Sequence, residues 1–304
     1  MLKKIIPVIH TQVFSAAPGG GNPCPVVFSC EELTSEHMRS IATHYMEETA
    51  FIIPTEETDC DVRLRYFVPN HEMEMCVHAT MGSIAAQAHK SLFEEGDVKV
   101  EIPIGKISTS WERRDDCYEV TVGQFLPHFI TDNPMISEVA VALNISEESI
   151  ALEMGPIQSV STSRAKLMIP IKDRKTLDSL IPNFEYLWRL CDEYNTTGFY
   201  PFTIETSQGK TVIYARQFPK RAGYNEDAAT GLAACALGTY LSRYEVVSSK
   251  IDGWHIFEIH QGYAMGRPSV LFAEIMIKNG EITDVRIKGR AEITAEELLV
   301  LPFE

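Results

Sequence analysis

Apolar and polar residues follow two rhythms along the chain, one typical of strands and the other of helices. In the first 125 residues, short runs that alternate or are continuously apolar predict strands. They lie at 3–14, 23–30, 49–54, 61–69, 97–105, 106–112 and 117–125. Helical spacing predicts a helix over 34–46, with Thr34 or Ser35 as its N-cap, and an Ala-rich helix from about Ala79 to Glu95 that Gly96 ends.

The second half of the chain has the same mixture of elements. Helices are predicted near Ser146–Leu152, around Lys175–Leu180, over Asn183–Glu193 and in the Ala-rich stretch 228–241. Strands are predicted at 209–219, 254–262, 269–289 and 290–294. Asn279-Gly280 within the third of these is a hairpin turn signal. The pattern therefore predicts a mixed α/β protein.

The two halves match when one is shifted along the other. A shift of 150 residues places Ala79 on Ala229 and Thr80 on Thr230, and both pairs open an Ala-rich helix after a strand that ends in Arg-x-Phe-(x)-Pro. We interpret this match as an internal duplication, although two Ala-rich helices can also arise separately.

A duplicated fold with a pseudo-twofold axis would bring two helix N-termini toward one cleft. Each N-terminus presents unpaired backbone N–H groups and about half a positive charge. Backbone amides near Thr80, Thr230 and Gly231 would then form an anion site that needs no lysine or arginine. We expect its guest to be the carboxylate of a small substrate.

Charge and composition exclude several classes of function. A formal net charge of -15 over 304 residues disfavours nucleic acid and anionic membrane as partners, because both need a basic face. No apolar run approaches the roughly 20 residues of a membrane span. The seven cysteines include no C-x-x-C pair. We therefore expect a cytoplasmic protein with free thiols.

The stretch "MEMCVHATMG" carries a cysteine and a histidine at the head of the first Ala-rich helix. With His71, Cys76 and His78 could suggest a metal, but the spacing fits no standard zinc set, and we expect no metal. Cys76 could instead be an acid–base thiol, since a helix N-terminus lowers a thiol pKa. The matching loop "NEDAATG" has no cysteine, so we expect Cys76 to be a small, half-buried packing residue.

Four other side chains are candidates for chemistry. His78 is either a capping histidine or a proton shuttle, and Asp227 is an N-cap of the second helix, a substrate contact or both. Glu47 and Glu48 precede the apolar strand "TAFII", where partial desolvation would raise a carboxyl pKa toward the range of a general acid or base. The residues alone favour Glu48 over Glu47 only weakly.

The Gly-rich loop "APGGGNP" does not have the spacing of a nucleotide-binding loop. It is either a flexible connection between two strands or a loop that lines a cleft. In the second case the amide of Asn22 is a candidate substrate contact.

Five motifs occur in a diagnostic order: "VFSAAPGGGNPCPVVF", "EETAFI", "CVHATMG", "NEDAATGLAA" and "QGYAMGRPS". With them the chain resembles the PhzF-like phenazine-biosynthesis family, a relative of diaminopimelate epimerase, from about Val13 to Ser269 and on into "VRIKGRAEI". The resemblance implies an α/β (α+β) fold of two similar domains related by a pseudo-twofold, each a curled β-sheet around a central helix. We place the domains at 1–120 plus about 285–304 and at 121–284, and we expect a homodimer without a cofactor.

The resemblance also implies roles for individual residues. Glu48 corresponds to the catalytic glutamate of the family's "ETAF" motif, His78 to the histidine of its "GHP" or "GHAT" motif, and Asp227 to the aspartate of its "EDPATG" motif. We expect the following residues to bind the substrate: Asn22, Val77, Ala79, Thr80, Ala229, Thr230 and Gly231.

Two positions depart from the family pattern. Val77 stands where the family has glycine, which narrows the room for a substrate against the backbone. Ala228 stands where the motif has proline. The substrate is therefore not carried over from the family.

The function expected from these features is cofactor-independent isomerisation of a small carboxylate-bearing metabolite, cyclic or open-chain. One alternative is an amino-acid epimerase or racemase of the diaminopimelate type, which the missing second cysteine disfavours. The other is a protein that binds a small ligand without turning it over, for which Val77 and Ala228 leave room.

Overall fold

The computed structural model describes residues 4–207, 209–247 and 251–301, and the chain divides into two compact units. Unit 1 comprises Met1–Ser15, Asn22–Gly123 and Lys288–Glu304, and unit 2 comprises Ala16–Gly21 and Gln124–Ile287. The sequence predicts domain boundaries near 120 and 285. In the structure they fall after Gly123 and Ile287, and the Gly-rich segment Ala16–Gly21 belongs to unit 2.

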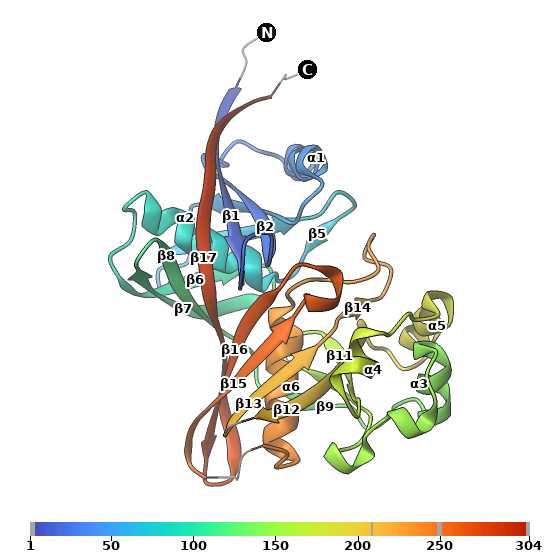
Figure 1. The fold of residues 1–304 in the computed structure, drawn as a ribbon. Helices are drawn as coiled ribbons and strands as arrows, with labels where there is room; N and C mark the ends of the chain where they lie inside the picture. The colour runs from blue at the N-terminus through green and yellow to red at the C-terminus, as the bar shows by residue number, and fades with distance from the viewer. Residues whose placement is uncertain (1–3, 208, 248–250, 302–304) are drawn as a thin grey trace. The chain divides into compact units, whose positions relative to one another are not determined.

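Unit 1 is a ring of strands around a helix (Figure 1). Its strands are β1 (Lys4–Val13), β2 (Asn22–Val27), β3 (Thr49–Ile53), β4 (Val62–Phe67), β5 (Glu72–Met73), β6 (Gly96–Ile102), β7 (Gly105–Arg114), β8 (Cys117–Gly123) and the C-terminal part of β17 (Glu281–Leu301). The ring runs β1, β2, β3, β4, β6, β7, β8 and β17, and β17 pairs with β1 to close it. A closed ring leaves no free edge among these strands.

Helix α2 (Val77–His89) is the central helix of unit 1 and contacts β1, β2, β3 and β8. Every residue from Val77 to Ala88 is buried, so the helix is enclosed on all sides. Small residues make this possible: a Cβ at Gly82 would lie 2.4 Å from the Thr11 hydroxyl on β1. The small Ala and Gly side chains that identified this helix in the sequence therefore allow the surrounding strands to pack closely against it.

Helix α1 (Ser35–Tyr45) covers the outside of unit 1, where Met38, Ile41 and Ala42 pack on residues of β1 to β4. Thr34 is the N-cap, and its hydroxyl accepts a hydrogen bond from the His37 amide.

Unit 2 repeats the plan of unit 1 in a second segment of the chain. Its strands are β9 (His128–Phe129), β10 (Gln158–Ser161), β11 (Ala165–Pro170), β12 (Gly198–Ser207), β13 (Lys210–Ala215), β14 (Phe218–Pro219), β15 (Gly253–Gln261) and β16 (Ser269–Lys278). From β10 to β16 the successive pairings are antiparallel, parallel, antiparallel, parallel and antiparallel. From β1 to β7 unit 1 has the same succession. This agreement in topology supports an internal duplication.

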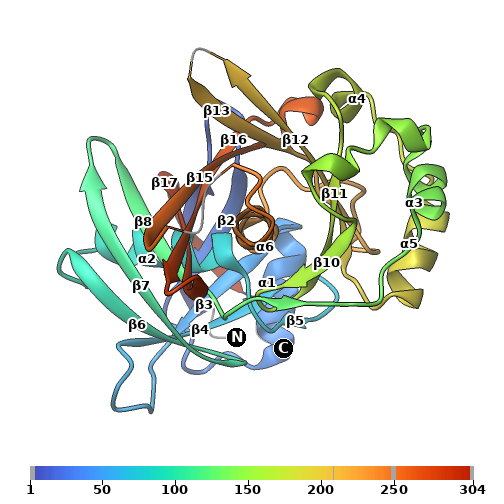
Figure 2. The same ribbon diagram turned by 90° about the horizontal axis from the view of Figure 1, so that it is seen from below.

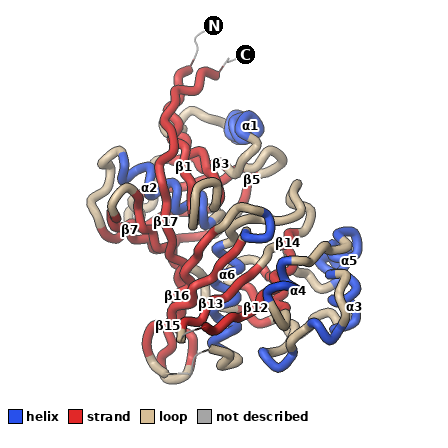
Figure 3. The backbone as a smooth tube through the Cα atoms, in the orientation of Figure 1, coloured by secondary structure: helices blue, strands red, loops and turns tan. Residues whose placement is uncertain are grey.

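Helix α6 (Gly231–Arg243) takes the central place in unit 2, in contact with β10, β11, β15 and β16. Figure 2 shows it nearly end-on with the strands of its unit around it. On the outer side, α3 (Ile136–Leu143), α4 (Arg174–Asp178) and α5 (Phe184–Glu193) form an apolar core with β11 and β12. Figure 3 shows that these outer helices are shorter than the central one.

Some predicted elements differ from those in the structure. The predicted helix at Ser146–Leu152 is wrong: only two 3-10 turns, Glu147–Ser149 and Leu152–Met154, occur there. The real helix, α3, was missed because its N-cap is Met135, which gives no capping signal. Strands β10, β11 and β12 were also missed. The hairpin is confirmed, since Asn279 and Gly280 form the turn with φ values of 54° and 75°.

The first Ala-rich helix begins and ends earlier than predicted. It starts at Val77 rather than Ala79 and ends at His89, well before Gly96. Because α6 starts at Gly231, the two central helices are offset by 231 − 77 = 154 residues instead of the 150 of the sequence overlay. The head of α2 therefore lies one turn before the position that the repeat indicated.

No helix within the described ranges is both long and apolar enough to cross a membrane.

We expect Gly82→Ala to destabilise unit 1, although alanine ordinarily favours a helix over glycine by about 1 kcal/mol. The added Cβ would meet the Thr11 hydroxyl at 2.4 Å, and overpacking of this kind costs about 1–3 kcal/mol. Thermal unfolding followed by circular dichroism measures the loss. Adding Thr11→Ala should restore part of it, and an undiminished loss in the double variant would contradict this packing argument.

Candidate functional site

Glu48 stands at the junction between α1 and β3. Met46 ends α1 in the left-handed conformation (φ 56°), and β3 begins at Thr49, whose side chain is fully buried. The Glu48 side chain is 19% exposed, so its carboxylate lies at the boundary between the core and the surface of unit 1. This is the partly desolvated carboxylate that the sequence indicated.

Cys76 and His78 lie at the head of α2. Cys76 is the N-cap residue in an extended conformation, and His78 is the second residue of the helix. Both are buried, with 3% and 8% of their surface exposed.

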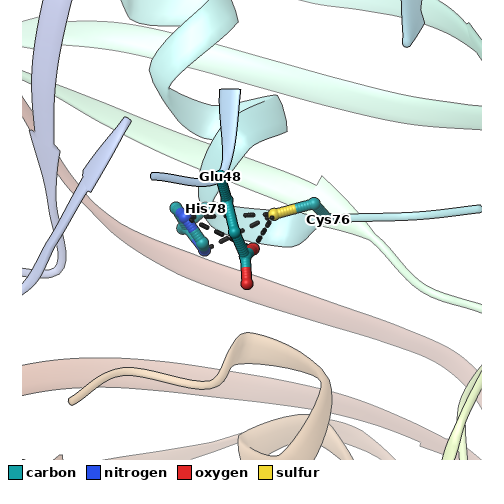
Figure 4. Close-up of side chains that lie close together, drawn as sticks. All are labelled: Glu48, Cys76 and His78. Atoms are coloured by element: carbon teal, nitrogen blue, oxygen red, sulfur yellow. Dashed lines mark hydrogen bonds and ion pairs between the residues drawn. The ribbon is translucent and has the colours of Figure 1, made fainter. Parts of the chain in front are cut away.

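Glu48, Cys76 and His78 form one cluster, in which the three side chains point toward one another (Figure 4). The Cys76 thiol donates to Glu48 Oε2, with a Sγ–Oε2 distance of 2.9 Å. His78 Nε2 lies 3.7 Å from the same oxygen, and Cys76 Sγ lies 3.5 Å from His78 Nδ1. A carboxylate, a thiol and an imidazole thus share one small space.

Burial raises the pKa of the Cys76 thiol well above its ordinary value, and the charge of Glu48 adds to the shift. The Ala79 amide lowers this pKa in part. Cys76 is therefore a neutral thiol at neutral pH and serves as a hydrogen-bond donor to the carboxylate.

The prediction for Cys76 needs correction. We expected a half-buried packing residue, but its sulfur is fully enclosed and contacts both Glu48 and His78. Cys76 directly precedes the first residue of α2, and this position is the sequence signal for its role. The signal was missed because the helix was predicted to start at Ala79.

The prediction for the amide of Thr80 also needs correction. Its N–H donates to the Cys76 carbonyl at 2.9 Å inside the helix, and its hydroxyl bonds to Cys76 O and to Tyr66 Oη. The amides that the helix itself leaves without a carbonyl partner are those of its first turn, Val77, His78 and Ala79. Two of these residues, Val77 and Ala79, were already in the predicted substrate-binding set.

Asn22 directly follows the Gly-rich loop and is the first residue of β2. It is 6% exposed. The loop itself, Ala16–Gly21, is held within unit 2. There Arg267 donates to the Gly21 carbonyl at 2.7 Å, and Gly21 N–H donates to the Ser269 hydroxyl at 3.0 Å. A Cβ at Gly20 would lie 1.9 Å from Pro268 O, which explains the glycine there. The motif "QGYAMGRPS" thus anchors the loop that precedes Asn22.

Asp227 lies in unit 2, three residues before the N-cap of α6. Thr230 is that N-cap, so the interpretation of Asp227 as the cap is wrong. The Thr230 hydroxyl donates to Asp227 Oδ2 instead, and the Ala229 amide approaches Oδ1 at 3.5 Å. The Asp227 backbone forms a bridge with Gln217.

Gln261, at the end of β15, fixes this loop. Its amide nitrogen donates to the Asp227 carbonyl at 2.8 Å and to the Thr230 hydroxyl at 3.1 Å. Its amide oxygen accepts from Thr230 N–H at 3.2 Å and from the buried Tyr200 hydroxyl at 2.9 Å. The Thr230 amide is therefore already bonded within the protein, and Gly231 opens the helix. Sequence reasoning missed Gln261, although it opens the "QGYAMGRPS" motif.

The predicted site residues therefore fall into two groups. Glu48 and His78 lie together within unit 1, joined there by Cys76, and Asp227 and Thr230 lie together within unit 2. The meeting of the two groups stays a prediction.

Nearly the whole chain is similar to proteins of one family. A family model described as phenazine biosynthesis-like protein (PhzC-PhzF) matches residues 11–297. An uncharacterized isomerase of Clostridium acetobutylicum is 32% identical over 284 residues, which cover 92% of this chain and 93% of that protein. A second uncharacterized isomerase, YddE of Escherichia coli, is 31% identical over 293 residues, covering 94% and 95%.

Solved structures agree in fold. The crystal structure of a PhzF-family phenazine biosynthesis protein of Bacillus anthracis superposes with a TM-score of 0.88 at 25% identity, covering 98% of this chain and 100% of that one. A hydroxyproline epimerase of Agrobacterium vitis, at 12% identity, has a TM-score of 0.64 with coverage of 98% and 93%. The predicted diaminopimelate epimerase-like fold is confirmed.

We expect Cys76 to resist alkylation by iodoacetamide at pH 8, because the thiolate is the nucleophile and burial keeps this thiol protonated. Cys60, which is only partly buried, should react at least about tenfold faster. Mass spectrometry of peptides from timed samples measures both rates. Unfolding in urea should remove the difference, whereas equal rates in the folded protein would contradict the enclosed, neutral thiol.

Proposed function

Because the chain belongs to the PhzC-PhzF family of phenazine biosynthesis-like proteins, we propose that it is a cofactor-independent isomerase of a small carboxylate-bearing metabolite. The observation that carries this proposal is the Glu48 carboxylate, which is partly buried and contacts both the Cys76 thiol and His78. A carboxylate in this setting is suited to accept and return a proton. Relatives named as isomerases support the reaction class.

In the proposed reaction Glu48 takes a proton from a carbon next to a carbonyl or an unsaturated system. The electron pair of that C–H bond moves into the adjacent π system, and a proton from Glu48 or solvent is added at another carbon. The substrate keeps its composition and oxidation level, so the reaction needs no redox partner. His78 would orient the substrate and assist the transfer.

We propose that the first turns of α2 and α6 bind the substrate carboxylate. Helix N-termini present backbone N–H groups and favour negative charge, and they stabilise charge that develops during the reaction. At α2 these are the amides of Val77 and His78, because the Ala79 amide already bonds to the Cys76 sulfur, and at α6 the first helical residue is Gly231. Asp227, Ala229 and Thr230 of unit 2 and Asn22 at the start of β2 are the other residues that we propose to contact the substrate.

We further propose that the protein acts as a cytoplasmic homodimer. A content of seven cysteines without a C-x-x-C pair is compatible with a reducing compartment, where thiols stay reduced. The dimer rests on the family resemblance, and sedimentation measures it.

A second candidate function is epimerisation at a carbon next to a carboxylate. The Cys76 thiol beside Glu48 favours it, because a thiol and a carboxylate could serve as proton donor and acceptor. The head of α6 carries Thr230 and no second cysteine. Deuterium entering that carbon with loss of chirality would favour epimerisation, and deuterium at a different carbon would favour the isomerase.

The proposed function is tested by finding a substrate and then removing the base. A thermal-shift screen of small aromatic and cyclohexadiene carboxylates identifies ligands, and NMR in deuterated buffer detects isomerisation. A ligand that stabilises the protein and is never converted would favour a binding protein instead.

With a substrate in hand, we expect Glu48→Gln to lower kcat by at least about 100-fold, since an amide cannot accept the proton. Glu47→Gln is the matched control, because it removes the neighbouring carboxylate and should leave kcat within about twofold. Circular dichroism checks that both variants fold. Undiminished activity in Glu48→Gln would contradict the mechanism.

A further inference from the structure

The cluster at the head of α2 has a second property that proton transfer does not require. It combines a carboxylate, a thiol and an imidazole, whose ligand atoms all lie within 4.8 Å of one another. Two of the residues, Cys76 and His78, are separated by a single residue, and Glu48 comes from 28 residues upstream. The sequence spacing alone therefore shows an incomplete set of metal ligands, and the fold supplies the third.

The distances between these atoms approach those of a zinc site. Around a tetrahedral Zn²⁺ with one sulfur, one nitrogen and one oxygen ligand, the ligand atoms lie about 3.3–3.6 Å apart. Here Sγ–Oε2 is 2.9 Å, Nε2–Oε2 is 3.7 Å and Sγ–Nε2 is 3.9 Å. Side-chain movements of about 0.5 Å would bring all three atoms to one ion.

From this arrangement we propose that Glu48, Cys76 and His78 form a three-ligand site for a thiophilic divalent cation of the Zn²⁺ class, which blocks the proton-transfer site. The thiolate is the ligand, so the Cys76 S–H bond breaks on binding, its proton passes to solvent, and the sulfur lone pair binds the ion. Three protein ligands leave the fourth position of a tetrahedral ion open to water or to a substrate oxygen. The ligand set selects against Mg²⁺ and Ca²⁺, which prefer all-oxygen coordination.

The regulatory part of this inference rests on the proposed function. A cation bound to Glu48 occupies the lone pairs that would accept the substrate proton, so bound zinc inhibits the isomerase. The binding part depends only on the three side chains, all within unit 1, and is tested without any substrate.

The test is titration of the metal-free, full-length protein with Co²⁺, which reports thiolate ligation by a charge-transfer absorption in the near ultraviolet. We expect one equivalent of Co²⁺ to bind with this signal and Zn²⁺ to displace it, while Mg²⁺ in excess has no effect. Isothermal titration with Zn²⁺ gives the affinity. Absence of the thiolate signal at the first equivalent would overturn the proposal.

Three ligand variants and one control locate the ion. Cys76→Ser should abolish the charge-transfer signal, and His78→Gln and Glu48→Gln should each weaken Zn²⁺ binding by more than about tenfold, since loss of a supporting partner alone costs that much. Cys60→Ser removes a free cysteine elsewhere in unit 1 and should bind like the parent protein. Parent-like binding in Cys76→Ser, or loss of binding in Cys60→Ser, would overturn the proposed site.

Two further measurements separate this proposal from the isomerase. Circular dichroism without metal shows which variants fold. If Cys76→Ser does not fold, the Zn²⁺ affinities of His78→Gln and Glu48→Gln test the site instead.

The second measurement uses a substrate that the protein converts. Zn²⁺ at saturation should lower its turnover at least about tenfold, and a chelator should restore it. Activation by Zn²⁺ would overturn the inhibitory role. Failure to find a substrate would leave the binding result intact, and loss of binding would leave the isomerase intact.

Discussion

The enclosure of α2 within a closed ring of strands is the constraint on which the rest of unit 1 depends. A helix buried on every side must be built from small residues, and the contact of Gly82 with Thr11 shows how little space remains. Because the helix is packed on every side, the contacts that bury it also position the residues at its head. Cys76 and His78 are thereby fixed beside the strand that Glu48 precedes.

This geometry places a carboxylate, a thiol and an imidazole in contact. The thiol keeps its proton because burial disfavours its charged form, and so it can donate to the carboxylate. The same side chains, once the thiol has lost its proton, are good ligands for a thiophilic cation. Proton transfer and the proposed metal binding therefore use the same side chains and exclude each other. In the first state the Cys76 thiol is protonated, and in the second its thiolate binds the cation.

The two units have central helices whose heads are built differently. At α2 the N-cap is a buried cysteine that contacts Glu48. At α6 it is Thr230, fixed by Gln261 and bonded to Asp227. Both arrangements leave the amides of the first helical turn without carbonyl partners within the helix. One fold repeated twice therefore offers two helix termini with different side-chain chemistry.

The sequence by itself determined the α/β class, the matching succession of elements in the two halves and the central Ala-rich helices, because periodicity and small-residue composition are local properties. Its ordered motifs, through the family that they resemble, supplied the candidates Glu48, His78 and Asp227. It did not determine where α2 begins, since Cys76 is an N-cap without a capping side chain. It also missed α3 and the contact between Glu48 and Cys76. That contact joins residues 28 positions apart. Only the tertiary structure decided this contact. The closure of the ring around α2, rather than any local preference of the chain, brings the start of β3 against the N-terminus of α2.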